Sequence, residues 1–438
     1  MQNKTSTPRR ERRALSHVGG RITLTGSDEQ ARSVIEHALG VSADESATMA
    51  HVHGFHSYPA RLHPVTAARL IEGLSKPGDV VLDPFCGSGT VLVEARRLGR
   101  AARGVDSNPL AIELAWLKTL GLPEGAGARL LEAAAHVTEH AEDRRLKKAG
   151  PTRRYPPQDR ELFDIHVLLE LDGLADGIDQ LGDPVARRML GLVLSALLTK
   201  VSRKSGDSSE QRQSRRLAAG YTIKLFRKKT EELVKRASEY EALLPPDAPP
   251  AKAMPGDARR LQGVGKFDLV VSSPPYPGVY DYLAHHEMRL RWLRLDAKKM
   301  DRAEIGSRRA LGKLSFEHAI DQWRKDFGDV LRALSKSVAP QGAIALVIAD
   351  STLAGRAVWA DEIVSQLAPA AGLSVVAAGA QPRPHFHGPS QRAFRDKPRR
   401  EHVLVLRPSA SERRAPPEPG SPRTSRWRRG RGAGGSAR

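Results

Sequence analysis

The 438-residue sequence contains a single cysteine, Cys86, and few aromatic residues, which make up 5% of the chain. One cysteine excludes an intrachain disulfide and any zinc site built mainly from cysteines. No apolar run is long enough to cross a bilayer, and the first residues lack the apolar stretch of a signal peptide. We therefore expect a protein of the cytoplasm that makes no contact with membranes.

Acidic residues are fewer than basic ones, which leaves a formal net charge of +20. The excess lies in three segments. Residues 1–13 carry five Lys/Arg against one Glu, residues 199–229 carry ten against two acidic residues, and residues 409–438 carry eight Arg against two Glu. Such clusters fit a polyanionic partner such as a nucleic acid, although solvated surface charge explains the two tails equally well.

A strand-like segment, residues 79–83, runs into the glycine-rich octet Asp83-Pro-Phe-Cys-Gly-Ser-Gly-Thr90. The pattern then predicts a helix over residues 91–99 and a second strand over 101–106 that ends in the carboxylate of Asp106. Glycines let a backbone approach a cofactor closely, and an acidic residue at the next strand end suits a ribose diol. The glycines are too few for the full dinucleotide motif, and no P-loop lysine follows them.

Another apolar strand, residues 268–272, leads directly into Ser273-Pro274-Pro275-Tyr276. Prolines fix φ and have no N–H, so the Ser273 hydroxyl and the Pro274 carbonyl are held in a stiff turn. These two acceptors could bind one exocyclic amino group, while the Tyr276 ring offers a planar surface for stacking. Alone, the motif fits a rigid structural turn more readily than a catalytic site.

Together the two motifs resemble those of the N4-cytosine/N6-adenine DNA methyltransferases, which use S-adenosylmethionine (SAM). The resemblance covers roughly residues 50–120 and 255–408. It implies that catalysis depends on Ser273, Pro274, Pro275 and Tyr276. It also implies that SAM contacts the following residues: Tyr58, Asp83, Phe85, Gly87, Gly89, Thr90, Asp106 and Asp257.

The resemblance implies methylation of a base amine in DNA, with a flipped or single-stranded base, as in restriction-modification. Ser273 is similar to the N4-cytosine branch, although Ser272 stands where that branch often has Thr. N6-adenine methylation stays open, as does methylation of a guanine amine in RNA, where Asn or Asp more often precedes the prolines. A nucleic-acid-binding protein that keeps SAM without turnover is the alternative from another class.

Hydrophobic periodicity divides the chain into parts. Strand patterns recur at residues 342–349, 373–378 and 402–406, while helical patterns occupy 160–171, 187–198 and 223–234. We expect a doubly wound α/β sheet, the Rossmann-like fold of SAM-dependent methyltransferases, formed by residues 31–125 and 251–408. Residues 126–250 are expected to form a helical insertion, and residues 1–30 and 409–438 disordered basic tails.

The helical insertion is interpreted as a possible nucleic-acid recognition domain, with a lid or a dimerisation module as the alternative. Six basic residues lie where its helical periodicity breaks, and we expect them to reach DNA phosphates. They are Arg203, Lys204, Arg212, Arg215, Arg216 and Lys224. The sequence does not determine the oligomeric state.

Histidines cluster at residues 51, 53, 56 and 63 and again at residues 385 and 387. Histidine and carboxylate ligands could hold a metal ion. Because methylation of an amine in a Ser-Pro-Pro-Tyr site needs no metal, we expect none.

Overall fold

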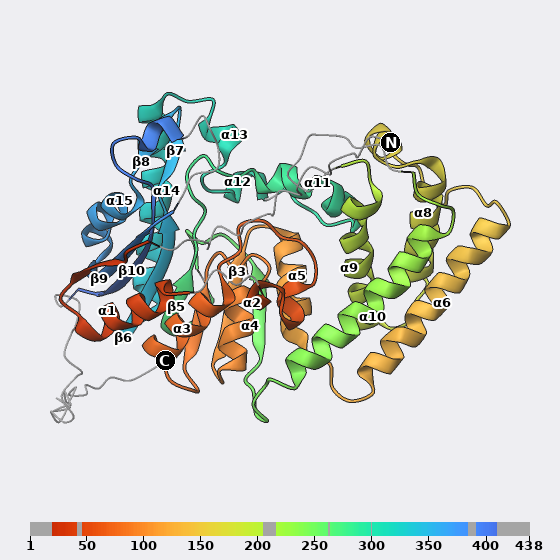
Figure 1. Cartoon of the computed structure of the whole chain (residues 1–438), viewed down its shortest axis with the longest axis horizontal. Coiled ribbons are helices and arrows are strands. Elements are labelled where there is room, and N and C mark those ends of the chain that lie inside the picture. The colour runs from red at the N-terminus through yellow and green to blue at the C-terminus, as the bar shows by residue number, and fades with distance from the viewer. Residues whose placement is uncertain are drawn as a thin grey trace, which may run out of the picture.

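The computed structural model describes residues 20–41, 46–204, 216–261, 263–298, 300–383 and 391–409. A twisted sheet with helices on both faces occupies one end of the molecule, and a group of long helices occupies the other (Figure 1). Within the described residues, no helix is both long and apolar enough to cross a membrane.

The main sheet has eight strands in the order β1-β9-β10-β6-β5-β2-β3-β4. The five strands β4, β3, β2, β5 and β6 run parallel, whereas β10, β9 and β1 are added in antiparallel pairs. This arrangement confirms the predicted doubly wound α/β sheet. The strands are β1 (Thr23–Gly26), β2 (Val80–Asp83), β3 (Ala101–Asp106), β4 (Ala251–Pro255), β5 (Phe267–Ser272), β6 (Val338–Ala349), β9 (Leu373–Pro382) and β10 (Arg400–Pro408).

Strand order reverses beside β2. The chain passes from β2 to β3 and β4 on one side, then returns to place β5 on the other side of β2. Ligands of open α/β sheets bind outside the carboxyl ends of the strands at such a switch point. The two motifs of the sequence follow β2 and β5, so both lie at this point.

Successive residues of β5 point to opposite faces of the sheet, as strand geometry requires. Leu269 and Val271 belong to a core with helices α1, α3, α4 and α5, whereas Val270 belongs to a core with α14 and α15. Because β5 is covered by helices on both faces of the sheet, most of its residues are apolar. The helices are α1 (Glu29–Leu39), α3 (Pro64–Leu74), α4 (Thr90–Arg97), α5 (Pro109–Leu120), α14 (Phe316–Ser337) and α15 (Ala360–Leu367).

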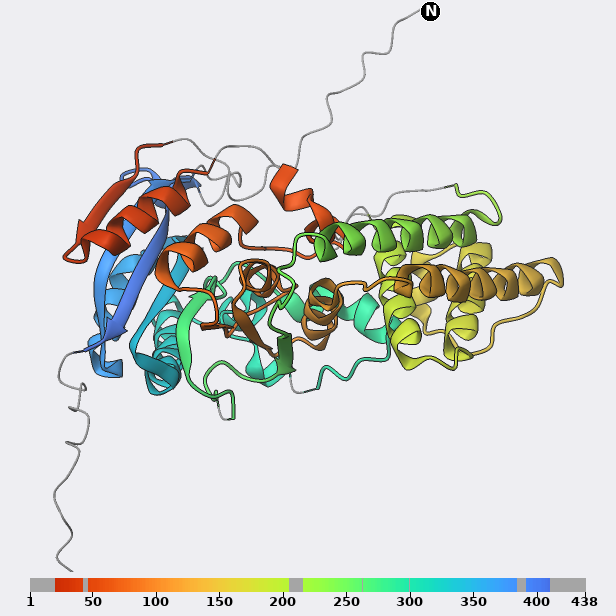
Figure 2. The same cartoon turned by 90° about the horizontal axis from the view of Figure 1, so that it is seen from below.

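Between β3 and β4 the chain forms the group of long helices seen at one end of the molecule (Figure 2). Its helices are α6 (Ala126–Leu146), α7 (Pro157–Leu162), α8 (Ile165–Asp179), α9 (Pro184–Val201) and α10 (Tyr221–Glu241). Their apolar faces form one core that continues into α5 and α11 (Tyr282–Trp292). All five helices lie within residues 126–250, the helical insertion expected from the sequence.

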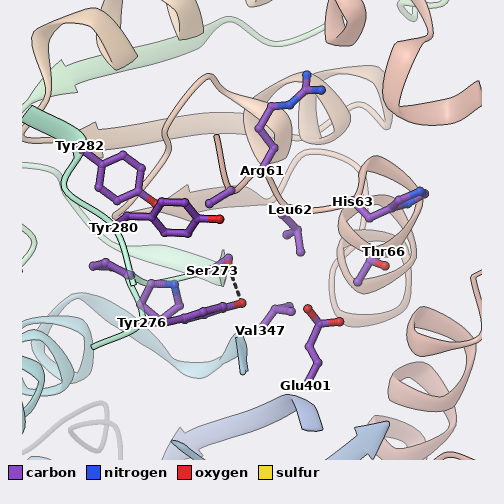
Figure 3. Close-up of a pocket in the computed structure, with 13 residues that line it drawn as sticks. Arg61, Leu62, His63, Thr66, Ser273, Tyr276, Tyr280, Tyr282, Val347 and Glu401 are labelled. Carbon is purple, nitrogen blue, oxygen red and sulfur yellow. Dashed lines mark hydrogen bonds between the residues drawn. The ribbon is translucent and has the colours of Figure 1, made fainter. Parts of the chain in front are cut away.

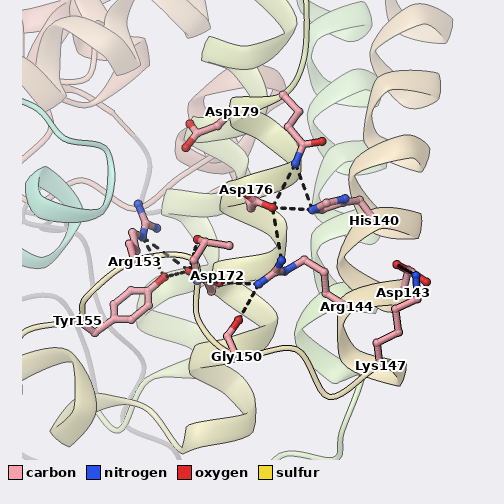
Figure 4. A network of polar contacts seen from close by, with 12 residues as sticks. His140, Asp143, Arg144, Lys147, Gly150, Arg153, Tyr155, Asp172, Asp176 and Asp179 are labelled. Atoms are coloured by element: carbon pink, nitrogen blue, oxygen red, sulfur yellow. Dashed lines mark hydrogen bonds and ion pairs between the residues drawn. The ribbon is translucent and has the colours of Figure 1, made fainter.

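A buried carboxylate fastens a loop of the helical insertion to α8 (Figure 4). Asp172 is fully buried, and its oxygens accept hydrogen bonds from the Thr152 amide and hydroxyl at 2.8 Å and from the Tyr155 hydroxyl at 2.5 Å. Arg144 of α6 adds a 3.5 Å ion pair. The loop between α6 and α7 is therefore held by polar contacts as well as by packing.

Two features differ from the expectations. Residues 23–30 were expected to be disordered, but β1 pairs with β9 and Asp28 caps α1 through a 2.9 Å bond to the Ala31 amide. The helix expected over residues 160–171 is interrupted, because Asp164 is extended (φ −64°, ψ 148°) and α7 ends before α8 begins. The first difference arises from pairing with β9 and from capping by Asp28, which outweigh local composition. At the second, Arg203 contacts both sides of the break, because its amide donates to the Leu162 carbonyl at 2.8 Å and its side chain pairs with Asp164.

The shorter elements lie around the carboxyl edge of the sheet and in the connections. They are α2 (Ser46–Met49), η1 (His51–Gly54), α12 (Met300–Ala303), α13 (Arg308–Leu311), β7 (Ser351–Leu353), β8 (Arg356–Val358), η2 (Pro369–Ala371) and η3 (Arg392–Phe394).

Candidate active site

Two adjoining pockets open at the carboxyl ends of β2 and β5. The first, which we call the loop pocket, is walled by the glycine-rich loop and by residues after β3. The second, which we call the turn pocket, contains Ser273 to Tyr276 (Figure 3). The two pockets share four residues: Ala60, Ser273, Pro275 and Tyr282.

Asp83, the last residue of β2, fixes the start of the glycine-rich loop by hydrogen bonds. Its Oδ1 accepts hydrogen bonds from the Ser272 hydroxyl at 2.6 Å and from the Phe85 amide at 3.1 Å. Burial raises the pKa of this carboxyl to about 7, because water no longer solvates the charged form. Asp83 thereby ties the end of β2 to the end of β5.

Two glycines of the loop make room for close approach. Gly87 has φ +48°, and a Cβ there would lie 3.2 Å from the Tyr58 ring. Gly89 has φ +88°, and its Cβ would lie 2.9 Å from the Ala115 Cα. A side chain at either position would strain the backbone or meet a neighbour, so glycine keeps the loop open to the loop pocket.

Asp106 ends β3 and lines the loop pocket. Its Oδ2 accepts a 2.9 Å bond from the Gly87 amide, and its Oδ1 accepts a 2.8 Å bond from the Asn108 amide. Burial raises the pKa of the carboxyl to about 6, although these backbone N–H groups oppose the rise. The carboxylate keeps lone pairs for a ligand at the pocket wall.

Tyr58 closes the loop pocket on the side facing α11. The Asn108 side chain donates to the Tyr58 hydroxyl at 3.4 Å and contacts His286 Nδ1 at 2.8 Å. The Tyr58 ring stacks beside His286 and Tyr282, with centroids 4.8 Å and 6.3 Å away. Two distant segments of the chain therefore form one aromatic wall, to which Asn108 is hydrogen-bonded.

In the turn pocket, the Ser273 hydroxyl lies 3.3 Å from the Tyr276 hydroxyl (Figure 3). Tyr280 and Tyr282 stand on one side, and Arg61 and His63 stand across the pocket. Burial raises the pKa of Tyr276 above its usual range, so its hydroxyl stays protonated. The pocket thus offers hydroxyl and carbonyl acceptors between aromatic rings.

The segment of residues 55–63 reaches both pockets and is held by Arg289 of α11, which is fully buried. Arg289 donates to His56 Nε2 at 2.9 Å and to the Ser57 hydroxyl at 3.0 Å. It also donates to the Thr199 hydroxyl at 3.0 Å and to the Ser195 carbonyl, both in α9. One guanidinium thus connects the helical insertion, α11 and the segment 55–63, which we call the lid segment.

The structure brings eight of the twelve residues expected for catalysis and SAM binding to the two pockets. Tyr58, Phe85, Gly87 and Asp106 line the loop pocket, and Ser273, Pro274, Pro275 and Tyr276 line the turn pocket. Asp83, Gly89 and Thr90 line neither pocket: Asp83 and Gly89 shape the loop, and Thr90 begins α4. Asp257 also lines neither pocket, and its carboxylate pairs with Arg259 at 2.8 Å.

Several pocket residues were not predicted from the sequence, among them Asn108 and Glu304 of the loop pocket and Glu401 of the turn pocket. Asn108 caps α5 two residues after Asp106, which is a signal that could have been used. Glu304 and Glu401 carry no local signal, because only the fold places them beside Ser273.

Of the six basic residues expected to reach nucleic acid, the four that the structure describes (Arg203, Lys204, Arg216 and Lys224) line neither pocket. Arg212 and Arg215 are outside the described residues. Arg203 pairs with Asp164, while Arg216 and Lys224 are exposed near the start of α10. Their role in binding stays a prediction.

Two groups of side chains among the described residues have the composition of a metal site: His51, His53 and Glu94, and Asp350, Asp361 and His402. In the first, Glu94 is already bonded to His53 at 2.7 Å and to Arg97 at 2.7 Å. A cation would compete with that guanidinium. His385 and His387 are outside the described residues.

Comparison with known proteins relates the N-terminal part of the site to DNA methylases. Residues 27–116 match the profile of the N6/N4 methyltransferase family, described as "DNA methylase". The type II methyltransferase M.BsoBI of Geobacillus stearothermophilus is 26% identical over 282 residues, 57% of this chain and 54% of that protein. M.MjaII of Methanocaldococcus jannaschii, also a type II methyltransferase, is 35% identical over 68 residues, 16% of this chain and 13% of that protein.

The chain thus spans about half the length, or less, of these curated relatives. Among solved structures, TrmN from Thermus thermophilus is similar at 13% identity and a TM-score of 0.33, over 80% of this chain and 50% of that chain. The rRNA methyltransferase aviRa from Streptomyces viridochromogenes is similar at 14% identity and a TM-score of 0.31, over 85% of this chain and 96% of that one.

Proposed function

Since this chain belongs to the N6/N4 DNA methylase family, we propose that it transfers the methyl group of SAM to the exocyclic amine of a DNA base. The observation that carries the proposal is the junction of the two pockets at Ser273, Pro275, Ala60 and Tyr282. A cofactor in the loop pocket and a base in the turn pocket would meet there. Such proximity is what a methyl transfer between two bound molecules requires.

The loop pocket fits SAM, the cofactor of this family. The Asp106 carboxylate can accept hydrogen bonds from both hydroxyls of a ribose, and Gly87 leaves the backbone open beside it. Aromatic and apolar side chains, among them Tyr58, Phe85 and Ile305, line the remainder. Bound there, SAM supplies an electrophilic methyl group on a sulfonium.

In the turn pocket, the Ser273 hydroxyl oxygen and the Pro274 carbonyl oxygen accept hydrogen bonds from the two N–H groups of the target amine. These hydrogen bonds favour a tetrahedral nitrogen whose lone pair points out of the base plane, toward the shared wall of the pockets. Both acceptors are prepositioned by the proline turn, so no reorganisation accompanies the development of charge. The nitrogen loses its proton as it gains the methyl group, and the Ser273 hydroxyl can relay that proton by accepting it while releasing its own to solvent.

A base in a duplex cannot enter a recess of this kind, so it must be flipped out or supplied single-stranded. Tyr276 offers its ring for stacking against the flipped base, and Tyr280 and Tyr282 border the same space (Figure 3).

We assign the target as N4 of cytosine. Ser273 supports this assignment, because the resemblance places serine before the two prolines in the N4-cytosine branch. N6 of adenine is the competing target, since the turn pocket offers acceptors that suit either amine. We further propose that the helical insertion helps to recognise DNA.

The test uses the full chain with labelled SAM and with DNA and RNA substrates of mixed sequence, followed by digestion to nucleosides. N4-methylcytosine from DNA is the expected product, and Ser273→Ala serves as the matched control. N6-methyladenine would overturn the base assignment alone. Labelled RNA without labelled DNA would overturn the substrate, and SAM binding without any methylated nucleoside would overturn the enzymatic proposal.

A further inference from the structure

A basic surface borders the turn pocket at the end of the molecule opposite the helical insertion. Residues 391–400 contain five basic residues against the single acidic Asp396. They connect β9 to β10 and lie near α13, β7 and β8, at the far end of the carboxyl edge from α8 and α9 (Figure 1). We define the rim surface by six residues: Arg308, Arg309, Arg392, Arg395, Lys397 and Arg399.

Both parts of the rim surface adjoin the catalytic turn. The Arg308 amide donates to the Tyr280 carbonyl at 3.1 Å, and the Arg308 side chain pairs with Asp281 at 3.3 Å. Glu401, two residues after Arg399, lines the turn pocket. The pKa of Tyr280 is raised by burial, and the Arg399 guanidinium opposes that rise, which places this cation within electrostatic reach of the pocket.

The segment that carries most of the rim surface is anchored to the body of the fold. Phe394 is buried and meets the Trp359 ring edge-on at 5.6 Å. Lys397 lies 4.1 Å over the same ring and pairs with Glu362 at 2.7 Å. Because these contacts fix the backbone, the exposed cations beside them are held in place before any partner arrives.

Arg392 and Arg395 are exposed, and neither makes an ion pair with another described residue. Their charge is therefore available to an outside anion. A row of separate cations beside a recess for a base fits the regularly spaced phosphates of a nucleic acid strand.

We propose that the rim surface binds DNA phosphates next to the flipped base, so that DNA crosses the turn pocket from the rim surface to the helical insertion. This inference rests on the proposed function and extends it. Extrusion of a base requires that the strand be held beside it, and contacts at two ends of the pocket would hold both flanks.

The test compares Arg392→Glu/Arg395→Glu with Lys76→Glu/Lys336→Glu, an equal change of charge at exposed sites. Lys76 precedes β2 and Lys336 lies in the last turn of α14, just before β6, so the control lies at the amino ends of the parallel strands, away from the pockets. The rim variant should bind DNA about tenfold or more weakly, with a salt slope smaller by about two units. The control variant should bind DNA as the wild type does, and both should keep wild-type SAM affinity and melting temperature.

Wild-type DNA affinity and salt slope in the rim variant would overturn the proposal, as would an equal loss in the control variant. Measuring methyl transfer by the wild type distinguishes a failure of the rim-surface proposal from a failure of the proposed function. If the wild type methylates DNA while the rim variant binds normally, the rim surface alone is excluded. If the wild type neither binds nor methylates DNA, both proposals fall.

Discussion

At the scale of single residues, Ser273 has the most direct part in the proposed chemistry. Ser273→Ala removes one of two acceptors for the target amine but leaves the Pro274 carbonyl and the loop pocket unchanged. We expect kcat to fall about a hundredfold, the usual cost of one prepositioned acceptor, with SAM affinity unchanged. Single-turnover methylation and calorimetry measure the two quantities.

Tyr276→Phe is the matched control for that experiment. It removes only the hydroxyl that lies 3.3 Å from Ser273 and keeps the ring for stacking. Its rate should lie much nearer to that of the wild type. A Ser273→Ala enzyme as fast as the wild type would show that the amine is held elsewhere.

Asp106 predicts a pH dependence of cofactor binding. An ionised carboxylate accepts hydrogen bonds from both ribose hydroxyls, whereas a protonated one donates its proton and loses acceptor capacity. Because the pKa of Asp106 is about 6 in the free protein, SAM affinity should rise as pH increases through about 6. We expect binding to be about tenfold weaker at about pH 5 than at about pH 7.5.

Asp106→Asn should bind SAM more weakly than the wild type at neutral pH, by roughly 1.5–3 kcal/mol, and with little dependence on pH in this range. The free energy of unfolding of the unliganded protein should depend on pH in the opposite direction and fall as pH rises. A carboxyl whose pKa is raised by folding stabilises the protein below its unfolded pKa, and that contribution is lost as pH rises to about 6. Equal pH profiles of SAM affinity in Asp106→Asn and the wild type would remove Asp106 from the binding equilibrium.

At the scale of elements, the sequence was sufficient where the signal is local. The glycine-rich octet predicts the turn between β2 and α4, because Gly87 and Gly89 adopt positive φ that other residues avoid. The apolar run before Ser273 likewise predicts β5. The conformation of each of these elements is determined by a few neighbouring residues.

Other elements depend on partners far along the chain. Thr23 of β1 lies opposite Ala380 of β9, so four ordinary residues near the N-terminus become an edge strand only once the sheet exists. The Asn108 side chain meets Tyr58 and His286, which are 50 and 178 residues away. Neither pairing has a pattern that periodicity could detect.

The polar network of the helical insertion provides a test at this scale. Asp172→Ala leaves the Tyr155 hydroxyl, the Thr152 amide and the Arg144 guanidinium without their buried acceptor. Loss of one partner in a buried charged network costs about 3–5 kcal/mol, so the free energy of unfolding should fall by about that amount. Asp143→Ala, which removes a paired but exposed carboxylate on α6, should change it by less than about 1 kcal/mol.

Denaturant titration measures both variants, and hydrogen exchange locates the effect. Faster exchange in α6 and α8, with β2 and β5 unchanged, would show that the helical insertion opens separately. An Asp172→Ala protein as stable as Asp143→Ala would mean that water replaces the lost contacts.

At the scale of the whole molecule, Arg289 connects the parts that the proposed reaction must coordinate. Its guanidinium bonds to the lid segment through His56 and Ser57 and to α9 through Ser195 and Thr199. It lies on α11, thirteen residues after Tyr276 of the proline turn. A displacement of the helical insertion by DNA would therefore reach the wall of the loop pocket through this side chain.

Arg289→Met keeps the length of the side chain but removes every donor. We expect faster hydrogen exchange in the lid segment and in α9, together with weaker SAM binding, because Tyr58 would no longer be held against the loop pocket. In the wild type, DNA should strengthen SAM binding, and by linkage SAM should strengthen DNA binding by the same factor. In Arg289→Met that factor should approach one.

Arg291→Met is the control, because Arg291 lies on the same helix and pairs with Asp159 at 2.5 Å without touching the lid segment in the described contacts. Calorimetric titration of SAM with and without DNA measures the coupling factor in each protein. Undiminished coupling in Arg289→Met would show that the helical insertion and the lid segment communicate by another route, or respond to DNA independently. Equal loss of coupling in Arg291→Met would instead indicate a general loosening of α11 rather than a specific role for the Arg289 contacts.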